Sequence, residues 1–397
     1  MKKWSNLKKS MLVLVLLSTF ILAFGSYDLY SRAKFPKPSG QYQVGTTLLE
    51  LVDTARLEPY THNPADHRRL LVQIYYPASI KENSPTVPYS PSPVAIEEDI
   101  NSVFRVPKLL IKRLTRTKTG YFDQQHAAPI EKQFPVLFFS HGWDGNRFQN
   151  SFMYGELVSH GYIIVSIEHT FNASGTVFRD GNKGGVEPLS KMKDTSFSSA
   201  MMETWTKDQQ FVLDQLEQLQ QGGNYFLADQ MNLKQVGVFG HSFGGATSAT
   251  TLVYDKRFKA GINMDGFYFG NAYKIGFEQP FMQLRSDNKR TEDMSDKELK
   301  EFDASREYYQ YLIWDEWNKR INAFAKNGYH SFTVKGSNHM SFSDFTYMMP
   351  LAFITAPSRD EHHRITNQLV LSFFNRYLKG SKDPVGVEKE LERFIND

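Results

Sequence analysis

The 397-residue chain contains no cysteine. This absence excludes a cysteine nucleophile, a disulfide framework, a cysteine-ligated zinc site and a thiolate-held iron–sulfur cluster. The chain also lacks a strong excess of charge of either sign. Its formal net charge is +3, and the lysines at positions 2, 3, 8 and 9 supply +4 of it, which leaves −1 for the remainder. This balance does not indicate a nucleic-acid-binding protein.

Sequence signals for bound phosphate, dinucleotide or metal are missing as well. No stretch follows the pattern G-x-x-x-x-G-K-[S/T] or G-x-G-x-x-G. His362 and His363 are adjacent in the sequence, a spacing that suits chelation from one helix face poorly. We therefore expect the protein to need neither a metal nor a cofactor.

The N-terminal segment has the features of a targeting sequence. Two lysine pairs are followed by an apolar run, and no residue between Lys9 and Asp28 is charged. A basic start before a short apolar run is typical of an export signal, and this run is just long enough to span a bilayer if it is not cleaved. We predict an export signal or signal anchor over residues 1–27, a linker over 28–40 and one catalytic domain over 41–397. The protein would then act outside the cytoplasm, either secreted or membrane-anchored.

Strand-like and helix-like patterns alternate through the rest of the chain. Apolar runs without polar interruption, such as Phe134–Ser140, are typical of strands buried on both faces, and amphipathic segments such as Met201–Gln220 indicate helices between them. This alternation predicts an α/β fold with a mostly parallel central sheet covered by helices on both faces. Residues 174–200 and 291–326 interrupt the pattern and are predicted insertions. Further predicted strands are 44–52, 70–76, 162–167, 236–239, 260–264, 280–284 and 331–334, and further predicted helices are 148–159, 245–254 and 364–378.

A five-residue G-x-S-x-G pattern at Gly240–Gly244 is the strongest chemical signal. It lies between an apolar strand and a helix rich in small residues, which is the context of a nucleophile elbow. The two glycines allow strand and helix to approach closely around a strained turn that exposes the central serine. The pattern predicts Ser242 as a nucleophile, and the amides at the start of the following helix could bind an oxyanion.

A nucleophilic serine needs a base and an orienting acid, which follow it in the order acid, then histidine, in chains of this kind. Asp265 comes directly after the next buried strand and is the preferred acid, with Asp255 and Asp287 as weaker candidates. His339 follows a later apolar strand and is the preferred base. His330 stands at the wrong end of that strand, and we expect His362 and His363 to be solvated.

A second oxyanion donor is expected from the loop after Phe134–Ser140. Gly142 would allow a tight turn there that aims the backbone N–H of Trp143 at the site. His141 is out of order for a catalytic base and is expected to support this loop.

Residues 103–118 form a basic, partly apolar stretch. It contains six basic and no acidic residues, and apolar residues at 103, 106, 110 and 114 follow helical spacing. Such a composition suits an amphipathic helix resting on a lipid surface, and it equally suits a core-packed helix with a solvated basic face. The sequence does not separate these two interpretations.

Taken together, these motifs resemble the plasma and intracellular type II platelet-activating factor acetylhydrolases. The resemblance rests on residues 240–247, Met264–Asp265, residues 336–339 and residues 139–142, and it extends over residues 40–380. It implies an α/β-hydrolase fold and calcium-independent hydrolysis of a short acyl ester on a phospholipid. It also implies the triad Ser242, Asp265 and His339, with the amides of Phe243 and Trp143 as the oxyanion hole.

Departures from the family pattern leave the substrate open. Trp143 is bulky where the family commonly has an aliphatic residue, which would narrow the acyl site, and the lysine-rich export segment is typical of a bacterial member. A broader carboxylesterase or polyester hydrolase, cutinase-like or dienelactone-hydrolase-like, is the alternative. A non-catalytic binding protein is disfavoured because all three triad positions are filled.

Overall fold

A computed structural model of the chain describes residues 34–61, 63–187, 191, 194–267, 272–287, 294–301, 328–348 and 358–396. The predicted export segment, residues 1–27, lies outside the described residues, and so do residues 302–326 of the predicted second insertion. Within the described ranges, none of the helices combines the length and the apolar composition that a bilayer crossing requires.

The described residues form one sheet with the strand order β11-β10-β9-β8-β7-β5-β6-β2-β1-β3, and β4 pairs with β2. Neighbours from β10 through β9, β8, β7 and β5 to β6 run parallel, and β2 joins β6 and β1 antiparallel. The predicted mostly parallel sheet is therefore confirmed. The strands are β1 (Gln43–Leu57), β2 (His67–Ile80), β3 (Phe122–Asp123), β4 (Ala127–Pro129), β5 (Phe134–Ser140), β6 (Ile163–Glu168), β7 (Met231–His241), β8 (Phe258–Met264), β9 (Phe281–Ser286), β10 (Tyr329–Val334) and β11 (Ile395–Asn396).

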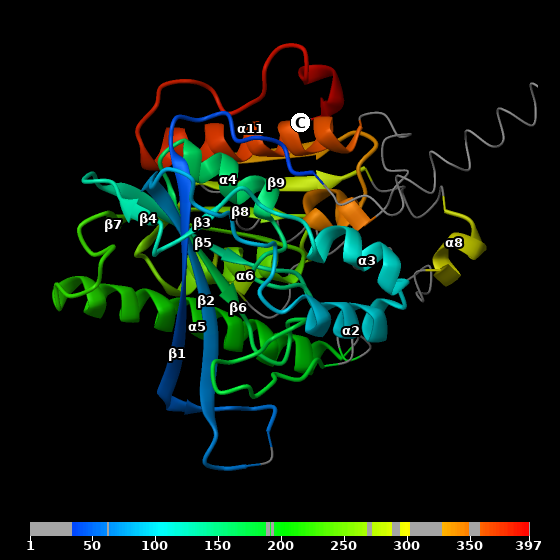
Figure 1. Ribbon diagram of the computed structural model, residues 1–397. Helices are drawn as coiled ribbons and strands as arrows, with labels where there is room; N and C mark the ends of the chain where they lie inside the picture. Colours follow the sequence, from blue (N-terminus) through cyan, green and yellow to red (C-terminus); the bar gives the residue numbers. More distant parts are fainter. Residues whose placement is uncertain are drawn as a thin grey trace, which may run out of the picture.

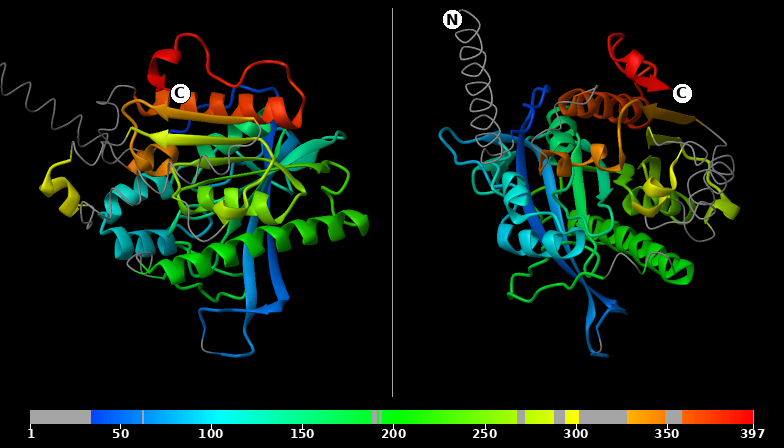
Figure 2. Two further views of the ribbon diagram at one scale, coloured as in Figure 1. Left: turned by 180° about the vertical axis from the view of Figure 1, so that it is seen from behind. Right: turned by 90° about the vertical axis from the view of Figure 1, so that its right-hand side faces the viewer.

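Helices cover both faces of this sheet. Helices α4 and α11 lie on one face, and α5 and α6 lie on the other (Figure 1). The same layering is visible from behind and from the side (Figure 2). The helices are α2 (Pro93–Phe104), α3 (Lys108–Thr115), α4 (Ser151–Ser159), α5 (Thr195–Gln221), α6 (Phe243–Tyr254), α7 (Ala272–Ile275), α8 (Asp296–Glu301) and α11 (Arg359–Leu378), with 3-10 turns η4 (His339–Phe342), η5 (Asp344–Met348) and η7 (Glu392–Phe394).

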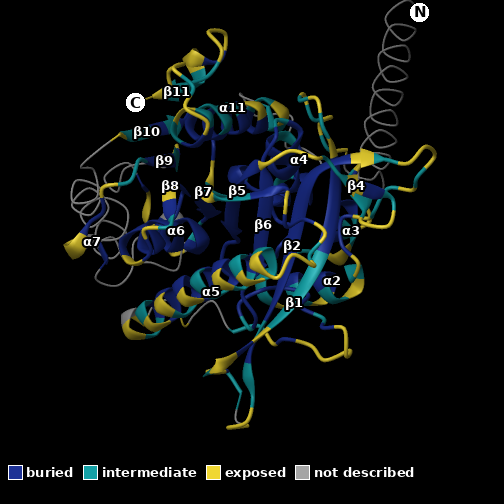
Figure 3. Ribbon diagram, turned by 90° about the vertical axis from the view of Figure 1, so that its left-hand side faces the viewer, coloured by how far each residue is buried: buried dark blue, intermediate teal, exposed yellow. Residues whose placement is uncertain are grey.

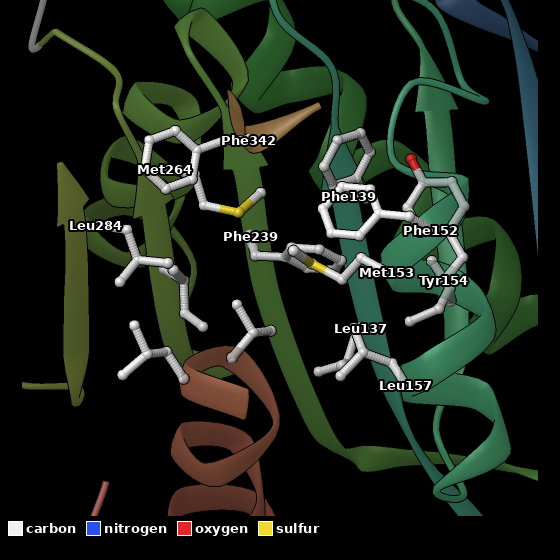
Figure 4. Close-up of a cluster of buried hydrophobic side chains, with 14 of the residues drawn as sticks. Leu137, Phe139, Phe152, Met153, Tyr154, Leu157, Phe239, Met264, Leu284 and Phe342 are labelled. Carbon is white, nitrogen blue, oxygen red and sulfur yellow. The ribbon is translucent and has the colours of Figure 1, made fainter. Parts of the chain in front are cut away.

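The central strands are buried because their side chains alternate between two apolar layers. On β5, Leu137 and Phe139 belong to the cluster shared with α4 and α11, whereas Val136 and Phe138 belong to the cluster shared with α5 and α6. Figure 3 shows these strands buried and one side of α5 exposed, and Figure 4 shows the first cluster between β5, β7, β8 and α4. Each fully buried Leu or Phe contributes roughly 1.5–3 kcal/mol, so the sheet is a rigid support for the loops at its edge.

The basic stretch 103–118 is not one helix. Helix α2 ends where Arg105 adopts a left-handed conformation, and α3 begins after Pro107. Leu114 is buried, and Val106 and Leu110 pack against the core. A single continuous helix over residues 103–118 is therefore wrong, and the packing of Val106, Leu110 and Leu114 agrees with the core-packed interpretation.

The prediction that His362 and His363 are solvated is also wrong. Both lie on the inward side of α11 and are buried. The His363 ring stacks on Phe152 at 3.7 Å between ring centroids, and its Nδ1 is 3.1 Å from the Tyr347 hydroxyl. Burial lowers the pKa of both histidines. The helix begins at Arg359, earlier than the sequence indicates, and this extra turn carries the two rings inward.

Candidate active site

The parallel register gathers the ends of several strands at one edge of the sheet. Ser140 of β5 is opposite Gly240 of β7, and Gly240 is opposite Asn263 of β8. The segments that leave these strands therefore start side by side. In open α/β sheets this carboxyl edge is where ligands bind.

Ser242 lies in a strained turn between β7 and α6. Its backbone angles are φ 56° and ψ −125°, a conformation that a residue with a side chain rarely adopts. The turn is tight: a Cβ on Gly240 would lie 2.4 Å from the Gly244 carbonyl carbon, and a Cβ on Gly244 would lie 2.1 Å from the Ser140 oxygen. The Ser242 N–H donates to the Met264 carbonyl at 2.8 Å, which holds the turn against β8. This is the geometry of a nucleophile elbow.

His339 bridges Ser242 and Asp265. Its Nε2 is 2.9 Å from Ser242 Oγ, and its Nδ1 is 2.8 Å from Asp265 Oδ2. The His339 side chain is 40% exposed, whereas that of Asp265 is 3% exposed. The His339 ring is therefore accessible from outside the protein, whereas Asp265 is shielded from water.

Asp265 is held in place by the end of β9. Its Oδ1 accepts the Ser286 N–H at 2.8 Å, and its Oδ2 accepts the Ser286 hydroxyl at 2.8 Å. Burial alone would raise the pKa of Asp265, but the hydrogen bonds and charge from His339 and the bonds from Ser286 outweigh it and hold this pKa below its ordinary value. The group is thus an anion at neutral pH.

The other candidates from the sequence lie elsewhere. Asp255 caps the far end of α6 and pairs with Arg257 at 2.7 Å. Asp287 accepts the Gly336 N–H at 2.9 Å, so it supports the loop before His339. His330 is at the opposite end of β10, 2.8 Å from the Tyr377 hydroxyl.

The backbone of Phe243 and the loop that carries Trp143 both lie next to Ser242. Phe243 is the first residue of α6, where backbone N–H groups point out of the helix end. The Gly142 carbonyl accepts from the Gly145 N–H at 2.9 Å and from His141 Nδ1 at 2.6 Å. In a trans peptide the C=O and N–H groups point in opposite directions. Because the Gly142 carbonyl faces these two donors, the Trp143 N–H of the same peptide points away from them. A Cβ on Gly142 would lie 3.1 Å from Ser242 Cβ, so this peptide runs directly beside the serine.

The Trp143 indole packs into a buried aromatic cluster. Its ring meets Phe243 edge-on at 5.6 Å, and Nε1 donates to the Glu187 carbonyl at 3.3 Å. The next residue, Asp144, is buried, and burial together with the charges of Asp99 and Glu187 raises its pKa to about 8. Burial therefore favours the uncharged form of this carboxyl group.

A second Ser–His–Asp arrangement begins at Ser140, directly before the loop that carries Trp143, and it is buried away from solvent. Ser140 Oγ is 2.8 Å from His169 Nε2, and His169 Nδ1 is 2.9 Å from Asp208 Oδ2. Arg68 donates twice to Asp208, at 3.1 and 2.7 Å. All four side chains are fully buried. Burial lowers the pKa of His169 to about 4 despite the Asp208 carboxylate. This group cannot meet a substrate, and it ties β2, β5, β6 and α5 together.

The residues that hold the loops around Ser242 in place were not identified from the sequence. Ser286 orients Asp265, and Asp344 accepts the N–H groups of Ser151 and Phe152 at the start of α4 at 2.7 and 3.1 Å. Gln149 contacts Gly142 and His241. None of these residues belongs to a local motif, so no short-range signal marks them. Among the described residues, no cluster of three or more His, Asp or Glu side chains is placed to hold a metal ion.

Comparisons with known proteins identify relatives of this chain. The sequence model of the family described as "Platelet-activating factor acetylhydrolase, isoform II" matches residues 27–388. A "Probable 1-alkyl-2-acetylglycerophosphocholine esterase" of Arthroderma benhamiae is 28% identical over 268 residues, which cover 62% of this chain and 64% of that protein, slightly under two thirds of its length. The "Platelet-activating factor acetylhydrolase" of Bos taurus is 23% identical over 384 residues, covering 89% of this chain and 79% of that protein.

A solved structure supports the fold independently. A ferulic acid esterase from Streptomyces cinnamoneus superposes with a TM-score of 0.68 at 23% sequence identity, covering 90% of this chain and 97% of that chain. The likeness shows that the two chains share the α/β-hydrolase fold.

Proposed function

The chain belongs to the platelet-activating factor acetylhydrolase isoform II family and is a carboxylic ester hydrolase, and on this premise we propose that it works through Ser242, His339 and Asp265. The observation that carries the proposal is the continuous pair of hydrogen bonds from Ser242 Oγ to His339 Nε2 and from His339 Nδ1 to Asp265 Oδ2. A neutral histidine in this tautomer can take the serine proton while the carboxylate stabilises the cation that results.

The reaction would proceed in two halves. Ser242 Oγ attacks the ester carbonyl as His339 Nε2 takes its proton, and the backbone N–H groups of Phe243 and Trp143 hold the oxyanion. The tetrahedral intermediate expels the alcohol, which takes the proton from His339 and leaves an acyl group on Ser242. A water molecule then attacks the acyl group as His339 takes its proton, and the second tetrahedral intermediate releases the carboxylic acid while Ser242 Oγ takes the proton back from His339.

The proposed substrate is an ester with a short acyl group, of the phospholipid sn-2 acetyl type. The names of the fungal and bovine relatives support it. The size of Trp143, whose backbone N–H is one of the proposed oxyanion donors, favours a small acyl group as well. The alternative is a broader carboxylesterase or polyester hydrolase, which would use the same three residues.

We also propose that the protein is exported by residues 1–27 and that residues 103–118 meet a lipid surface. Four basic residues there, Arg105, Lys108, Arg116 and Lys118, are exposed, and Leu109 is half-exposed. Basic groups near an anionic membrane contribute about 1 kcal/mol each. This surface is smaller than the sequence suggests, because Leu114 belongs to the core.

The discriminating experiment is an activity profile on esters of increasing acyl length, with and without a phosphocholine head group. We expect acetyl esters to give the highest kcat/KM, with a steep fall beyond about four carbons, and the head group to raise kcat/KM further. A flat profile that ignores the head group would favour the broader carboxylesterase, and no hydrolysis of any ester would contradict the enzyme itself.

A further inference from the structure

Gln149 lies where three loops of the proposed site meet: the loop after β5, the elbow after β7 and the loop that carries His339. Its Oε1 accepts the Gly142 N–H at 3.0 Å, and its Nε2 is 2.6 Å from His241 Nδ1. Its backbone carbonyl accepts the Asp344 N–H at 2.7 Å, five residues after His339. We propose that Gln149 is a positioning residue that sets the oxyanion loop, the elbow and the histidine loop relative to one another.

The hydrogens in this network can be arranged in one way only. The Gly142 N–H is a donor, so the Gln149 atom that faces it must be the oxygen, and its amide nitrogen must donate to His241 Nδ1. His241 then carries its proton on Nε2, which donates to the His339 carbonyl at 2.8 Å. The chain of bonds thus runs from the oxyanion loop through Gln149 and His241 to the backbone of the proposed base.

Burial makes this arrangement rigid. Gln149 is 1% exposed and His241 is 3% exposed, so water cannot replace a lost partner. Burial and the neighbouring His339 lower the pKa of His241 to about 3, so this ring is neutral and accepts at Nδ1 at every pH where the enzyme would work. His339 and Asp265 are the titratable groups that act on it.

Each partner of Gln149 stands next to a group of the proposed mechanism. Gly142 precedes Trp143, His241 precedes Ser242, and His241 also holds the His339 carbonyl. Because a misplacement of 1 Å can cost about 100-fold in rate, loss of this bridge should lower kcat. The inference rests on the proposed function, since it concerns the geometry of the same residues.

The test measures kcat of Gln149→Glu and of the wild type over a range of pH. The quantity of interest is the ratio of the two kcat values at each pH. The introduced carboxylate can still accept the Gly142 N–H, but its second oxygen faces the Nδ1 lone pair of His241. When either the introduced carboxyl group or the His241 ring carries an extra proton, His241 keeps both hydrogen bonds, one to the carboxyl group and one to the His339 carbonyl. Without it, one ring proton must serve two acceptors, the introduced carboxylate and the His339 carbonyl.

We therefore expect the ratio of kcat for Q149E to that of the wild type to rise as the pH falls. It should approach one near pH 6 and fall about 100-fold by pH 9, with KM changed less than about threefold. Gln149→Met, which fills the space without hydrogen bonds, should lose about 100-fold at every pH. A pH-independent ratio for Q149E, or wild-type kcat in Q149M, would overturn the proposal.

The matched control is the neighbouring residue Asn150. It is equally buried and ties α4 to the Phe342 carbonyl at 2.7 Å, but it contacts neither Gly142 nor His241 in the described structure. Asn150→Ala should lower the melting temperature yet keep kcat within about threefold and show a flat ratio. A pH-dependent ratio in N150A would overturn the assignment to Gln149. Failure of the proposed function would instead appear as an active Ser242→Ala enzyme, whatever Q149E does.

Discussion

Replacing Asp265 by asparagine tests the proposed acid without changing the shape of the site. Oδ1 of Asp265 accepts a backbone N–H from Ser286, a donor that cannot become an acceptor. The asparagine oxygen must therefore stay at the Oδ1 position, and its NH₂ group must take the place of Oδ2. There it faces the Ser286 hydroxyl, which can turn to accept, and His339 Nδ1.

The consequence is a wrong tautomer of His339. With an NH₂ donor at its Nδ1, the ring must carry its proton on Nε2, which then cannot accept the Ser242 proton. Loss of this function in comparable triads costs about 10⁴-fold in kcat, or ~5.4 kcal/mol of transition-state stabilisation. Since the Ser286 N–H fixes the amide, rotation of the asparagine cannot rescue the enzyme.

Steady-state kinetics on a soluble acetyl ester would measure the effect, with thermal unfolding to show that the variant folds. Asp255→Asn is the matched control, because Asp255 pairs with Arg257 at the far end of α6 and should keep kcat within about threefold. An Asp265→Asn enzyme within tenfold of the wild type, together with an inactive Asp255→Asn enzyme, would refute the assignment.

Three further outcomes are expected. His169 and His241 are buried and neutral, with pKa values of about 4 and 3 against 6.5 in the unfolded chain, so each lowers the unfolding free energy by about 2 kcal/mol as the pH falls from above 6.5 to 5. The raised pKa of Asp144 acts in the opposite direction, so the measurement is the difference in unfolding free energy between the wild type and His169→Gln by denaturant titration; a difference that does not change with pH would contradict this. Activity should survive EDTA, because backbone N–H groups hold the oxyanion; inhibition reversed by added calcium would argue against it. Leu109→Ser should weaken binding to anionic vesicles and spare hydrolysis of a soluble ester, whereas Leu114→Ser should lower the melting temperature; equal vesicle binding by Leu109→Ser and wild type would remove the lipid-surface proposal.

Local patterns were enough to predict the parts of the fold that depend on local sequence. The apolar run Phe134–Ser140 is a strand with those bounds, because a strand buried on both faces is predominantly apolar. The elbow was predictable because the G-x-S-x-G pattern lies within five residues and Gly240 is required by its close approach to Gly244, although the contact that requires Gly244 is with Ser140 at the end of β5.

The rest depends on contacts between distant residues. Gln149 meets His241, 92 positions away, and Ser286 meets Asp265, 21 positions away, so no local pattern reveals either pair. The break between α2 and α3 did leave a signal, since Pro107 disfavours a helix through that point. The helical spacing of the apolar residues concealed it.

The central claim, that Ser242 forms the acyl-enzyme, is tested most directly by covalent labelling with an organophosphate ester followed by peptide mass spectrometry. We predict one adduct per chain, on Ser242, with activity lost in proportion to labelling, and no adduct in an inactive Ser242→Ala variant. An adduct on another residue, or a Ser242→Ala variant that still hydrolyses the acetyl ester, would contradict the claim.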